Sequence, residues 1–343
     1  MSSPTSIVPP QGHVLVTGVN GFIGSHIADG LLKLGYRVRG TVRSASKADW
    51  VQELMAQRHP SANFETVIVS DMTVPGAFTE AIKGVDGIAH VAGDMSFHPD
   101  PNKVITPIVK AVRDLLQTAA RETSVKRFVF TSSDRAISSA INGKEATLDD
   151  TMWNEAAVER AWRPAPFEQD RTWDVYEALK TQTEQEVWKF SREEKPAFVV
   201  NSVLPTFNVG VILHAEQQGS TAKWIMDFWN DPSHSGPLQD FGASWFIDVD
   251  DTALLHIAGL TQEDVKDERL LGFASPFNFN SWLDVFRQLD SGKSWPANDS
   301  KQEKNLCRVD TTREVNLLKR FGRSGWTSIH DSVQKEVLES NCS

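Results

Sequence analysis

A tyrosine and a lysine four residues apart could carry acid–base chemistry in this sequence. Tyr176 and Lys180 belong to the segment YEALK, and on a helix this spacing places both side chains on one face. A free tyrosine has a pKa near ~10, and we expect the adjacent ammonium to lower the pKa of Tyr176 so that the phenol gives up its proton more readily. The chain has only two tyrosines, so a chance pairing is less expected than usual. An exposed amphipathic helix is the alternative interpretation.

A serine at the end of a predicted strand is a candidate partner for this pair. Thr131-Ser132-Ser133 follows the apolar run RFVF. In doubly wound sheets the carboxyl ends of the strands face the ligand crevice. A hydroxyl there can donate to a carbonyl oxygen as that oxygen gains negative charge. Capping of the following segment is the alternative, and it suits Ser132 better than Ser133.

The segment TGVNGFIG, residues 17–24, has the spacing of a dinucleotide-binding loop. Gly18 allows a tight turn, Gly21 lets a pyrophosphate approach the backbone, and Gly24 lets the next helix pack close to the sheet. The predicted strand before the loop and helix after it supply the context that the motif requires, and the helix N-terminus favours phosphate. A plain strand-to-helix turn that uses glycine is the alternative.

The end of the second predicted strand indicates which dinucleotide binds. A site for NAD usually has an acidic residue about 20 residues after the glycines. Here the strand 37–42 is followed by RSASK, which contains no acid. Arg43 and Lys47 could hold a 2′-phosphate, so we predict NADPH. A solvated basic loop is the alternative.

The elements that must position these residues alternate between strand and helix patterns. We predict strands at 13–17, 37–42, 64–69, 87–91, 127–131 and 198–204, and helices at 22–34, 45–58, 77–83, 104–121 and 175–190. This rhythm predicts an α/β fold with a Rossmann-type, doubly wound parallel sheet.

The second half of the chain has a different character. After Pro205 the sequence reads as irregular and is rich in Trp and Phe, which suits a smaller lobe that closes over a pocket. We therefore expect residues 1–205 to form mainly the NADP-binding Rossmann domain. Residues 206–343 would form mainly a C-terminal substrate-binding lobe, with some segments returning to the sheet.

Composition excludes several function classes. The net charge of −10 argues against a nucleic-acid partner. Two cysteines, with no nearby pair of histidines, predict neither a disulfide framework nor a metal site. The sequence has no apolar run of the ~18 residues that a membrane helix needs, and its N-terminus does not read as a signal peptide. We therefore expect a cytoplasmic protein without membrane association.

Together these motifs resemble those of the extended short-chain dehydrogenases/reductases. Within them, the chain is similar to the dihydroflavonol-4-reductase-like group, and most of all to the fungal and yeast NADPH-dependent aldehyde/ketone reductases. The resemblance covers almost the whole chain. Its carriers are residues 16–24, 39–44, 90–92, 124–129 and 131–133, Tyr176 with Lys180, and Leu204 with Pro205.

The resemblance implies a mechanism in which a hydride passes from C4 of NADPH to a carbonyl carbon. It implies that Ser133 polarises the carbonyl, that Tyr176 protonates the alkoxide, and that Lys180 holds the nicotinamide ribose and tunes Tyr176. Asp71 and Met72 match an adenine contact, and Pro205 lies where the family's chain passes the nicotinamide. The implied cofactor contacts are Gly18, Asn20, Gly21, Phe22, Ile23, Gly24, Arg43, Lys47, Asp71, Met72, Tyr176, Lys180 and Pro205.

Three positions depart from the family pattern. Leu179 stands where the family often has Ser, which we expect to affect packing only. Asp134 and Arg135 follow the catalytic serine, where relatives usually have small or uncharged residues. This pair could reshape the pocket or form a salt bridge, and we favour the salt bridge. Asp94 is unusual beside a pocket for an apolar substrate.

The substrate predicted from the pocket is an apolar or aromatic ketone or aldehyde. The lining is expected from residues 94–98, Trp173 and the aromatic-rich segment 207–246, and a polyketide-like intermediate of fungal secondary metabolism would fit it. Two other functions stay open: a nucleotide-sugar epimerase or dehydratase of the same fold, and a non-catalytic NADP(H)-sensing regulator. The chain could act as a monomer or a homodimer.

Overall fold

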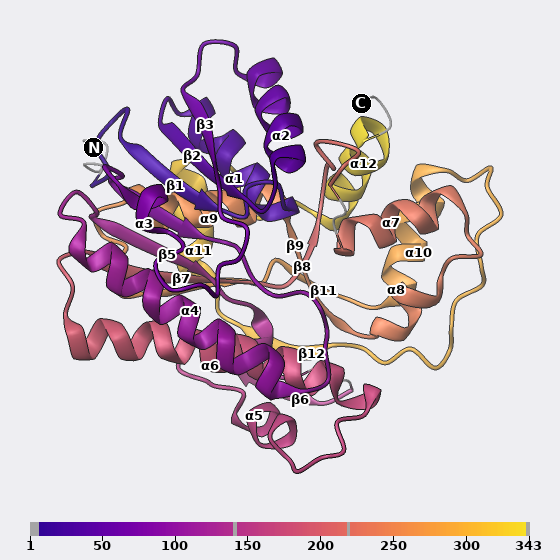
Figure 1. Cartoon of the computed structure of the whole chain (residues 1–343). Helices are drawn as coiled ribbons and strands as arrows, with labels where there is room; N and C mark the ends of the chain where they lie inside the picture. The colour runs from indigo at the N-terminus through magenta and orange to yellow at the C-terminus, as the bar shows by residue number, and fades with distance from the viewer. Residues whose placement is uncertain (1–6, 140–142, 218–219, 341–343) are drawn as a thin grey trace.

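A parallel sheet forms the centre of the molecule in the computed structural model, which describes residues 7–139, 143–217 and 220–340 (Figure 1). Within these residues the sheet has seven strands in the order β10-β7-β5-β4-β1-β2-β3, and every neighbouring pair is parallel. The strands are β1 (His13–Thr17), β2 (Arg37–Val42), β3 (Phe64–Ile68), β4 (Gly87–His90), β5 (Arg127–Thr131), β7 (Val199–Pro205) and β10 (Arg269–Gly272). The predicted Rossmann-type α/β fold is confirmed.

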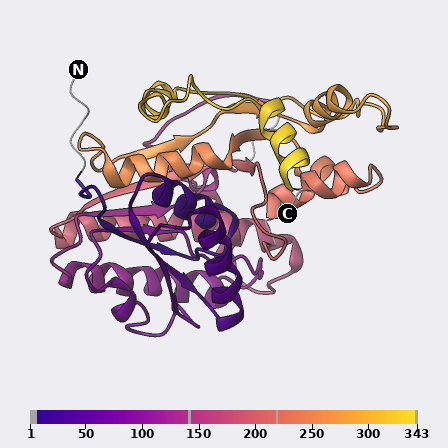
Figure 2. The ribbon, with the colours of Figure 1, turned by 90° about the horizontal axis from the view of Figure 1, so that it is seen from above.

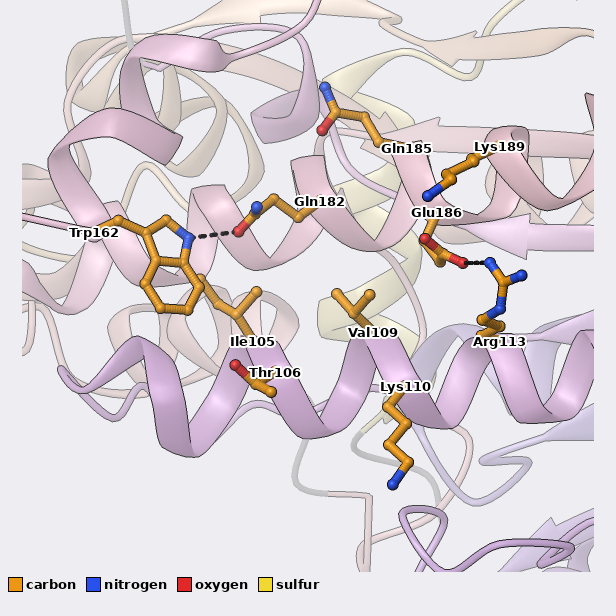
Figure 3. A pocket seen from close by; sticks show the side chains of 10 residues that line it. All are labelled: Ile105, Thr106, Val109, Lys110, Arg113, Trp162, Gln182, Gln185, Glu186 and Lys189. Carbon is orange, nitrogen blue, oxygen red and sulfur yellow. Dashed lines mark hydrogen bonds and ion pairs between the residues drawn. The ribbon is translucent and has the colours of Figure 1, made fainter.

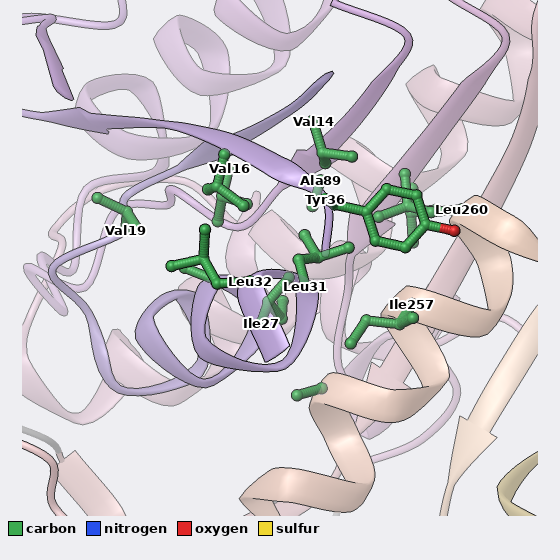
Figure 4. Close-up of a cluster of buried hydrophobic side chains, with 14 of the residues drawn as sticks. Val14, Val16, Val19, Ile27, Leu31, Leu32, Tyr36, Ala89, Ile257 and Leu260 are labelled. Atoms are coloured by element: carbon green, nitrogen blue, oxygen red, sulfur yellow. The ribbon is translucent and has the colours of Figure 1, made fainter. Parts of the chain in front are cut away.

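Helices cover both faces of this sheet, because alternate side chains of each strand point to opposite faces. On one face, Val14 and Val16 of β1 pack with Ile27 of α1 and Ile257 of α9 (Figure 4). Leu15 points to the other face. The first face carries α1 (Phe22–Lys33), α2 (Ala45–Arg58), α9 (Val249–Thr261) and α11 (Thr312–Arg320), and the second carries α3 (Thr79–Ile82), α4 (Pro101–Arg121) and α6 (Thr172–Glu194).

A second lobe lies to one side of the sheet and is built from the C-terminal part of the chain (Figures 1 and 2). It contains a small sheet of β8 (Phe207–Val209), β9 (Ser244–Asp248) and β11 (Ser275–Phe277), with α7 (Ser220–Asn230), α8 (Gly236–Phe241), α10 (Phe279–Leu289) and α12 (Ile329–Glu339). Its core is strongly aromatic, and Trp282 and Phe286 are completely buried.

The expectation of an irregular chain after Pro205 was wrong. In α10, Phe279, Trp282, Leu283 and Phe286 have the spacing of one helical face, and this face is buried. The aromatic residues therefore belong to regular elements and form a core. Furthermore, the chain returns from the second lobe to the main sheet through α9 and β10.

The region between β5 and α6 lies at the bottom of the molecule in the view of Figure 1. It contains the short 3-10 helix η1 (Asp134–Ala136), β6 (Glu145–Leu148), α5 (Glu155–Ala161) and a second 3-10 turn η2 (Gln169–Arg171). β6 pairs with β12 (Leu306–Val309) from the C-terminal part. Cys307 of β12 is a buried free thiol, and Cys342 lies outside the described residues. None of the helices in the described residues combines the length and apolar character needed to cross a bilayer.

Candidate active site

The glycine loop between β1 and α1 is packed so closely that side chains would not fit. Gly18 has a φ of +65°, and a Cβ on it would lie 3.1 Å from the Cα of Ala92. A Cβ on Gly24 would lie 2.5 Å from the carbonyl oxygen of Gly18. No side chain caps the N-terminus of α1, and its first turn contains no acidic residue. Backbone N–H groups at this helix end are therefore suited to a pyrophosphate.

The other residues of the loop are arranged so that they would act mainly through their backbone. Phe22 packs its ring edge-to-face on His26 at 5.5 Å. Ile23 packs against the core beneath α1, and Asn20 lies partly exposed in the loop. Gln217, from the second lobe, donates to the carbonyl oxygen of Gly21 at 3.4 Å. No local sequence pattern indicates this contact, because it joins residues nearly 200 positions apart.

The two basic residues after β2 differ in their surroundings. Arg43 is exposed and makes no hydrogen bond or ion pair with any other residue that the structure describes. In contrast, the Lys47 ammonium lies 3.4 Å from Oε2 of Glu216. Beside them, Trp50 stacks on His214 with ring centroids 4.6 Å apart. Arg43 is thus the freer of the two cations for a 2′-phosphate.

The predicted adenine and nicotinamide contacts lie at the ends of β3 and β7. Oδ1 of Asp71 accepts from the backbone N–H and the hydroxyl of Thr73, at 2.8 and 2.6 Å, and these bonds lower the pKa of Asp71. Met72 is partly buried against apolar clusters. Pro205 is buried beside Gly272, on which a Cβ would lie 3.0 Å from the Cα of Pro205. The side chains of Asp71 and Met72 are therefore engaged within the protein, which leaves their backbone for a ligand.

Ser133, Tyr176 and Lys180 are brought together at the carboxyl edge of the sheet. Ser133 follows β5 and forms the N-cap of η1, which packs against α6, the helix that carries Tyr176 and Lys180. A Cβ built on Gly93 would lie 3.9 Å from Nζ of Lys180. Because the neighbouring Ala92 touches Gly18, the Lys180 ammonium lies close to the glycine loop.

The proton affinities at the site differ from the expectation. Burial, followed by the charge of Asp134, raises the pKa of Tyr176 to about 12, so the predicted lowering by Lys180 was wrong. Burial also lowers the pKa of Lys180 to about 8, although Glu184 partly offsets this effect. The ammonium of Lys180 makes no hydrogen bond or ion pair with another described residue, and is free to bind a ligand.

Asp134 and Arg135 form the predicted ion pair, but Asp134 has a second contact that the sequence did not indicate. Nε of Arg135 lies 3.7 Å from Oδ2 of Asp134, and Nη1 of the same guanidinium lies 3.8 Å from Oε1 of Glu177. The Arg135 guanidinium also lies over the ring of Phe241 at 5.5 Å. The hydroxyl of Ser133 donates to Oδ1 of Asp134 at 2.9 Å. Asp134 thus contacts the candidate catalytic serine directly.

Two aromatic rings pack directly on Tyr176. Phe97 stacks on Tyr176 at 5.1 Å, and Trp173 meets it edge-on at 5.8 Å. Phe241, from the second lobe, packs on Trp173 at 6.1 Å. Phe97 has a φ of +50°, a conformation that bulky side chains rarely adopt. The segments expected to line the pocket therefore meet at the phenol, while Asp94 turns back to accept from the N–H of Ser96 at 2.6 Å.

A buried carboxylate beneath the site was missed by the sequence analysis. Glu184 is completely buried and binds Arg269 of β10 through two bonds of 2.8 and 2.9 Å. It also accepts from the hydroxyls of Ser132, directly after β5, at 2.7 Å, and Ser202 on β7, at 2.6 Å. Glu184 therefore ties α6 to three strands one helical turn after Lys180. Its position four residues after Lys180 was the available signal.

A further cavity lies away from these residues. It has a volume of about 540 Å³ and lies on the outer face between α4 and α6 (Figure 3). Charged side chains such as Lys110, Arg113 and Glu186 line it. None of the predicted site residues contributes to it, so it is separate from the active site.

Comparison with known proteins identifies the family. The model of the NAD dependent epimerase/dehydratase family matches residues 14–269. The "NAD-dependent epimerase/dehydratase terH" of Aspergillus terreus is 59% identical over 340 residues, covering 99% of this chain and 100% of that protein. "Aldehyde reductase 2" of Sporidiobolus salmonicolor is 38% identical, with 97% of both chains covered.

A solved structure shares the fold at lower identity. Yeast methylglyoxal/isovaleraldehyde reductase Gre2, in complex with NADPH, superposes with a TM-score of 0.79 at 22% identity, covering 96% of this chain and 98% of that one. The resemblance inferred from the motifs is thereby confirmed. This chain belongs to the NAD dependent epimerase/dehydratase family, the extended short-chain dehydrogenases/reductases.

Proposed function

We propose that this protein reduces a ketone or aldehyde to the alcohol with NADPH. The observation that carries the proposal is that Ser133, Tyr176 and Lys180 lie at one edge of the sheet, beside the glycine loop. Ala92 and Gly93 lie between Lys180 and that loop. Relatives with the same fold support it, since Aldehyde reductase 2 is named for an aldehyde substrate and Gre2 was solved with NADPH.

The residues present fit NADPH. The glycine loop has no room for side chains at Gly18 and Gly24. A pyrophosphate can approach a backbone closely only where such side chains are absent. Arg43 has a planar guanidinium free for a 2′-phosphate, and the unpaired Lys180 ammonium is suited to ribose hydroxyls. When bound, NADPH supplies the hydride that the carbonyl carbon receives.

The protein's own residues would bind the carbonyl and supply the proton. With a pKa of about 12, Tyr176 is protonated throughout the neutral range and is a proton donor to the alkoxide oxygen. Ser133 would donate to the carbonyl oxygen as that oxygen gains negative charge, and Lys180 would bring positive charge to the same edge. Glu184 would keep α6 fixed against the strands that carry Ser133 and Pro205.

The substrate would be an apolar or aromatic carbonyl compound. Phe97, Trp173 and Phe241 would contact it, because Phe97 and Trp173 pack on the Tyr176 ring and Phe241 packs on Trp173. A polyketide-like intermediate of fungal secondary metabolism suits such a lining, and the reducing cytosol suits the free thiol of Cys307. Residues 1–205 would then serve mainly the cofactor and 206–343 mainly the substrate, with α9 and β10 shared.

A second candidate is epimerisation or dehydration of a nucleotide sugar, which the printed name of the 59% identical relative favours. Such an enzyme retains tightly bound NAD, whereas a reductase exchanges NADPH at every turnover. The absence of an acid in residues 43–47 counts against an NAD site.

The test is oxidation of NADPH with a panel of aromatic and aliphatic ketones and aldehydes, with NADH for comparison. We expect turnover with NADPH, and a loss of roughly 10²- to 10⁴-fold in kcat in Tyr176→Phe at unchanged NADPH affinity. NAD that copurifies and survives dialysis would instead favour the epimerase. Tight NADPH binding without turnover of any carbonyl would favour an NADP(H)-sensing regulator.

A further inference from the structure

A short segment that follows β8 crosses from the second lobe to the glycine loop. Residues 211–217 connect β8 to α7 and contain neither helix nor strand. Leu213 is buried in the core of the main sheet, whereas its neighbour Ile212 packs against the aromatic core of the second lobe. We call residues 211–217 the brace, because they pack against both cores and end against the first turn of α1.

The side chain of Gln217, the last residue of the brace, is 4% exposed and fully engaged in hydrogen bonds. Its Oε1 accepts from the backbone N–H of Leu213 at 2.9 Å, and this bond fixes the orientation of the amide because a backbone N–H can only donate. Nε2 donates to the carbonyl oxygen of Gly21 at 3.4 Å and to Oγ of Ser25. The Ser25 hydroxyl itself donates to the carbonyl oxygen of Phe22 at 3.0 Å, so it is the acceptor for Gln217. Both amide hydrogens of Gln217 are therefore used on the first turn of α1.

The other end of the brace is bonded to the next residue of the same helix. Nε2 of the buried His26 lies 2.9 Å from the carbonyl oxygen of Val211, and Nδ1 lies 2.7 Å from Oδ1 of Asp250. A carbonyl oxygen and an ionised carboxylate can only accept, so both ring nitrogens carry a hydrogen and both donate. Val211 and Gln217, the two ends of the brace, are thus bonded to the consecutive residues Ser25 and His26.

These contacts fall where α1 has no cap of its own. Gly21 is the N-cap of α1, and no side chain among the described residues caps this helix end. The carbonyl oxygen of Gly21 accepts the first helical bond from the N–H of Ser25 at 3.0 Å, and Gln217 donates to the same oxygen. The peptide planes of this turn set the directions of the N–H groups that are suited to a pyrophosphate. A residue of the second lobe therefore holds the turn on which those directions depend.

We propose that Gln217 is a positioning residue of the dinucleotide site, which holds the first turn of α1 so that its N–H groups already point to where the pyrophosphate binds. A site that is ordered in advance loses less entropy when its ligand binds, and its affinity is higher for that reason. The inference goes beyond the proposed function, because it requires only a dinucleotide in the glycine loop and holds equally for a reductase and an epimerase.

The first test is the affinity of Gln217→Met for NADPH and NADH, because this change keeps the length of the side chain and removes its hydrogen bonds. A neutral hydrogen bond corresponds to a factor of roughly 3 to 10 in an equilibrium constant, so Kd for both dinucleotides should rise by about that factor. The pyrophosphate is common to both, whereas Arg43→Ala should weaken the binding of NADPH alone. An unchanged Kd, or a loss confined to NADPH, would overturn the proposal.

Gln302→Met is the matched control. Gln302 also belongs to the second lobe and has the same pattern of bonds, since its amide donates to the carbonyl oxygen of Gln239 at 3.1 Å and accepts from the N–H of Phe279 at 3.3 Å. These bonds stay within the second lobe, so Kd for both dinucleotides should be unchanged. Equal losses of affinity in Gln217→Met and Gln302→Met would mean that the lobe is loosened as a whole, which contradicts a specific role of Gln217.

The second test uses the unaltered chain and does not depend on how a variant folds. Because coupling is reciprocal, bound NADPH must stabilise the brace by the same factor by which the brace strengthens binding. Hydrogen–deuterium exchange of residues 211–217 should therefore be slowed by NADPH, roughly 3- to 10-fold, together with that of residues 21–25. Slower exchange of residues 21–25 alone, with residues 211–217 unaffected, would refute the coupling.

Both measurements are independent of turnover. If no carbonyl compound reacts, the proposed function fails, whereas the affinities and the exchange rates still decide the role of Gln217. In Gln217→Met without cofactor, residues 21–25 should exchange faster than in the unaltered chain, because the first turn of α1 has lost its external support. An unchanged exchange rate there would show that Gln217 does not hold this turn.

Discussion

Removal of the guanidinium of Arg43 should weaken NADPH binding and leave NADH binding unchanged. Arg43 is exposed and has no partner among the described residues, so Arg43→Ala should alter the free energy of unfolding by no more than about 0.5 kcal/mol. A hydrogen bond to a charged group contributes about 1.5–3 kcal/mol. At 1.4 kcal/mol for each tenfold change, Kd for NADPH should rise roughly 10- to 150-fold.

The neighbouring lysine should matter less, because Glu216 already neutralises part of its charge at 3.4 Å. We therefore expect Lys47→Ala to weaken NADPH binding less than Arg43→Ala does. Conversely, Glu216→Gln should tighten NADPH binding slightly, by up to about 1 kcal/mol, since surface ion pairs are worth that much at most. NADH, which has no 2′-phosphate, should respond to neither change.

The assay is titration of each variant with NADPH and NADH at fixed ionic strength, followed by the fluorescence of the 11 tryptophans. Arg192→Ala is the matched control, because Arg192 is an exposed arginine on α6 without a hydrogen bond or ion pair among the described residues. An equal loss of affinity for NADPH and NADH in Arg43→Ala would refute recognition of a 2′-phosphate by this residue. So would an unchanged NADPH affinity.

Three further predictions concern stability. Glu184→Gln should lower the free energy of unfolding by about 3–5 kcal/mol in urea denaturation, because it leaves the Arg269 guanidinium buried without its partner. Glu186 is more exposed than Glu184, so Glu186→Gln should lower the free energy of unfolding by at most about 1 kcal/mol. Trp282→Ala should cost about 3–5 kcal/mol, since this side chain is fully buried in the aromatic core; a loss below about 1 kcal/mol would contradict that packing. Because the pKa of Lys180 is lowered to about 8 in the folded protein, the unfolded chain binds more protons than the folded one between pH 8 and the pKa of Lys180 in the unfolded chain. In the cofactor-free protein, the free energy of unfolding should therefore rise with pH over this window, by about 1.4 kcal/mol per pH unit at most. Lys180→Met should abolish this rise.

Much of the architecture could be predicted because its signals are local. Apolar runs with β-branched residues placed β1, β2 and β5 at the bounds that the structure shows. A Cβ on Gly21 or Gly24 would lie 3.2 or 2.5 Å from the carbonyl oxygen of Gly18, so contacts within the loop itself require these two glycines. Such requirements act within one strand–turn–helix unit, so they appear in the sequence as a pattern.

The second lobe shows where local patterns failed. Its aromatic residues lie on faces of α7 and α10 that are buried against each other and against β8 and β9. The spacing of Phe279, Trp282, Leu283 and Phe286 does mark α10 as a helix with one apolar face. What covers that face depends on which surfaces meet, and those surfaces come from parts of the chain up to 130 residues apart.

The sequence by itself determined the fold class, the glycine loop and the identity of the candidate catalytic residues, because each depends on residue type and short spacing. Only the tertiary structure decided their electrostatics. The spacing of Tyr176 and Lys180 suggested an acidified phenol, but burial and Asp134, which approaches from the end of β5, raise its pKa instead. Likewise, Glu184 acquires its partners only when β5, β7 and β10 lie side by side. Desolvation and charge–charge interactions depend on distances in space, and these distances are set when segments remote in sequence pack together.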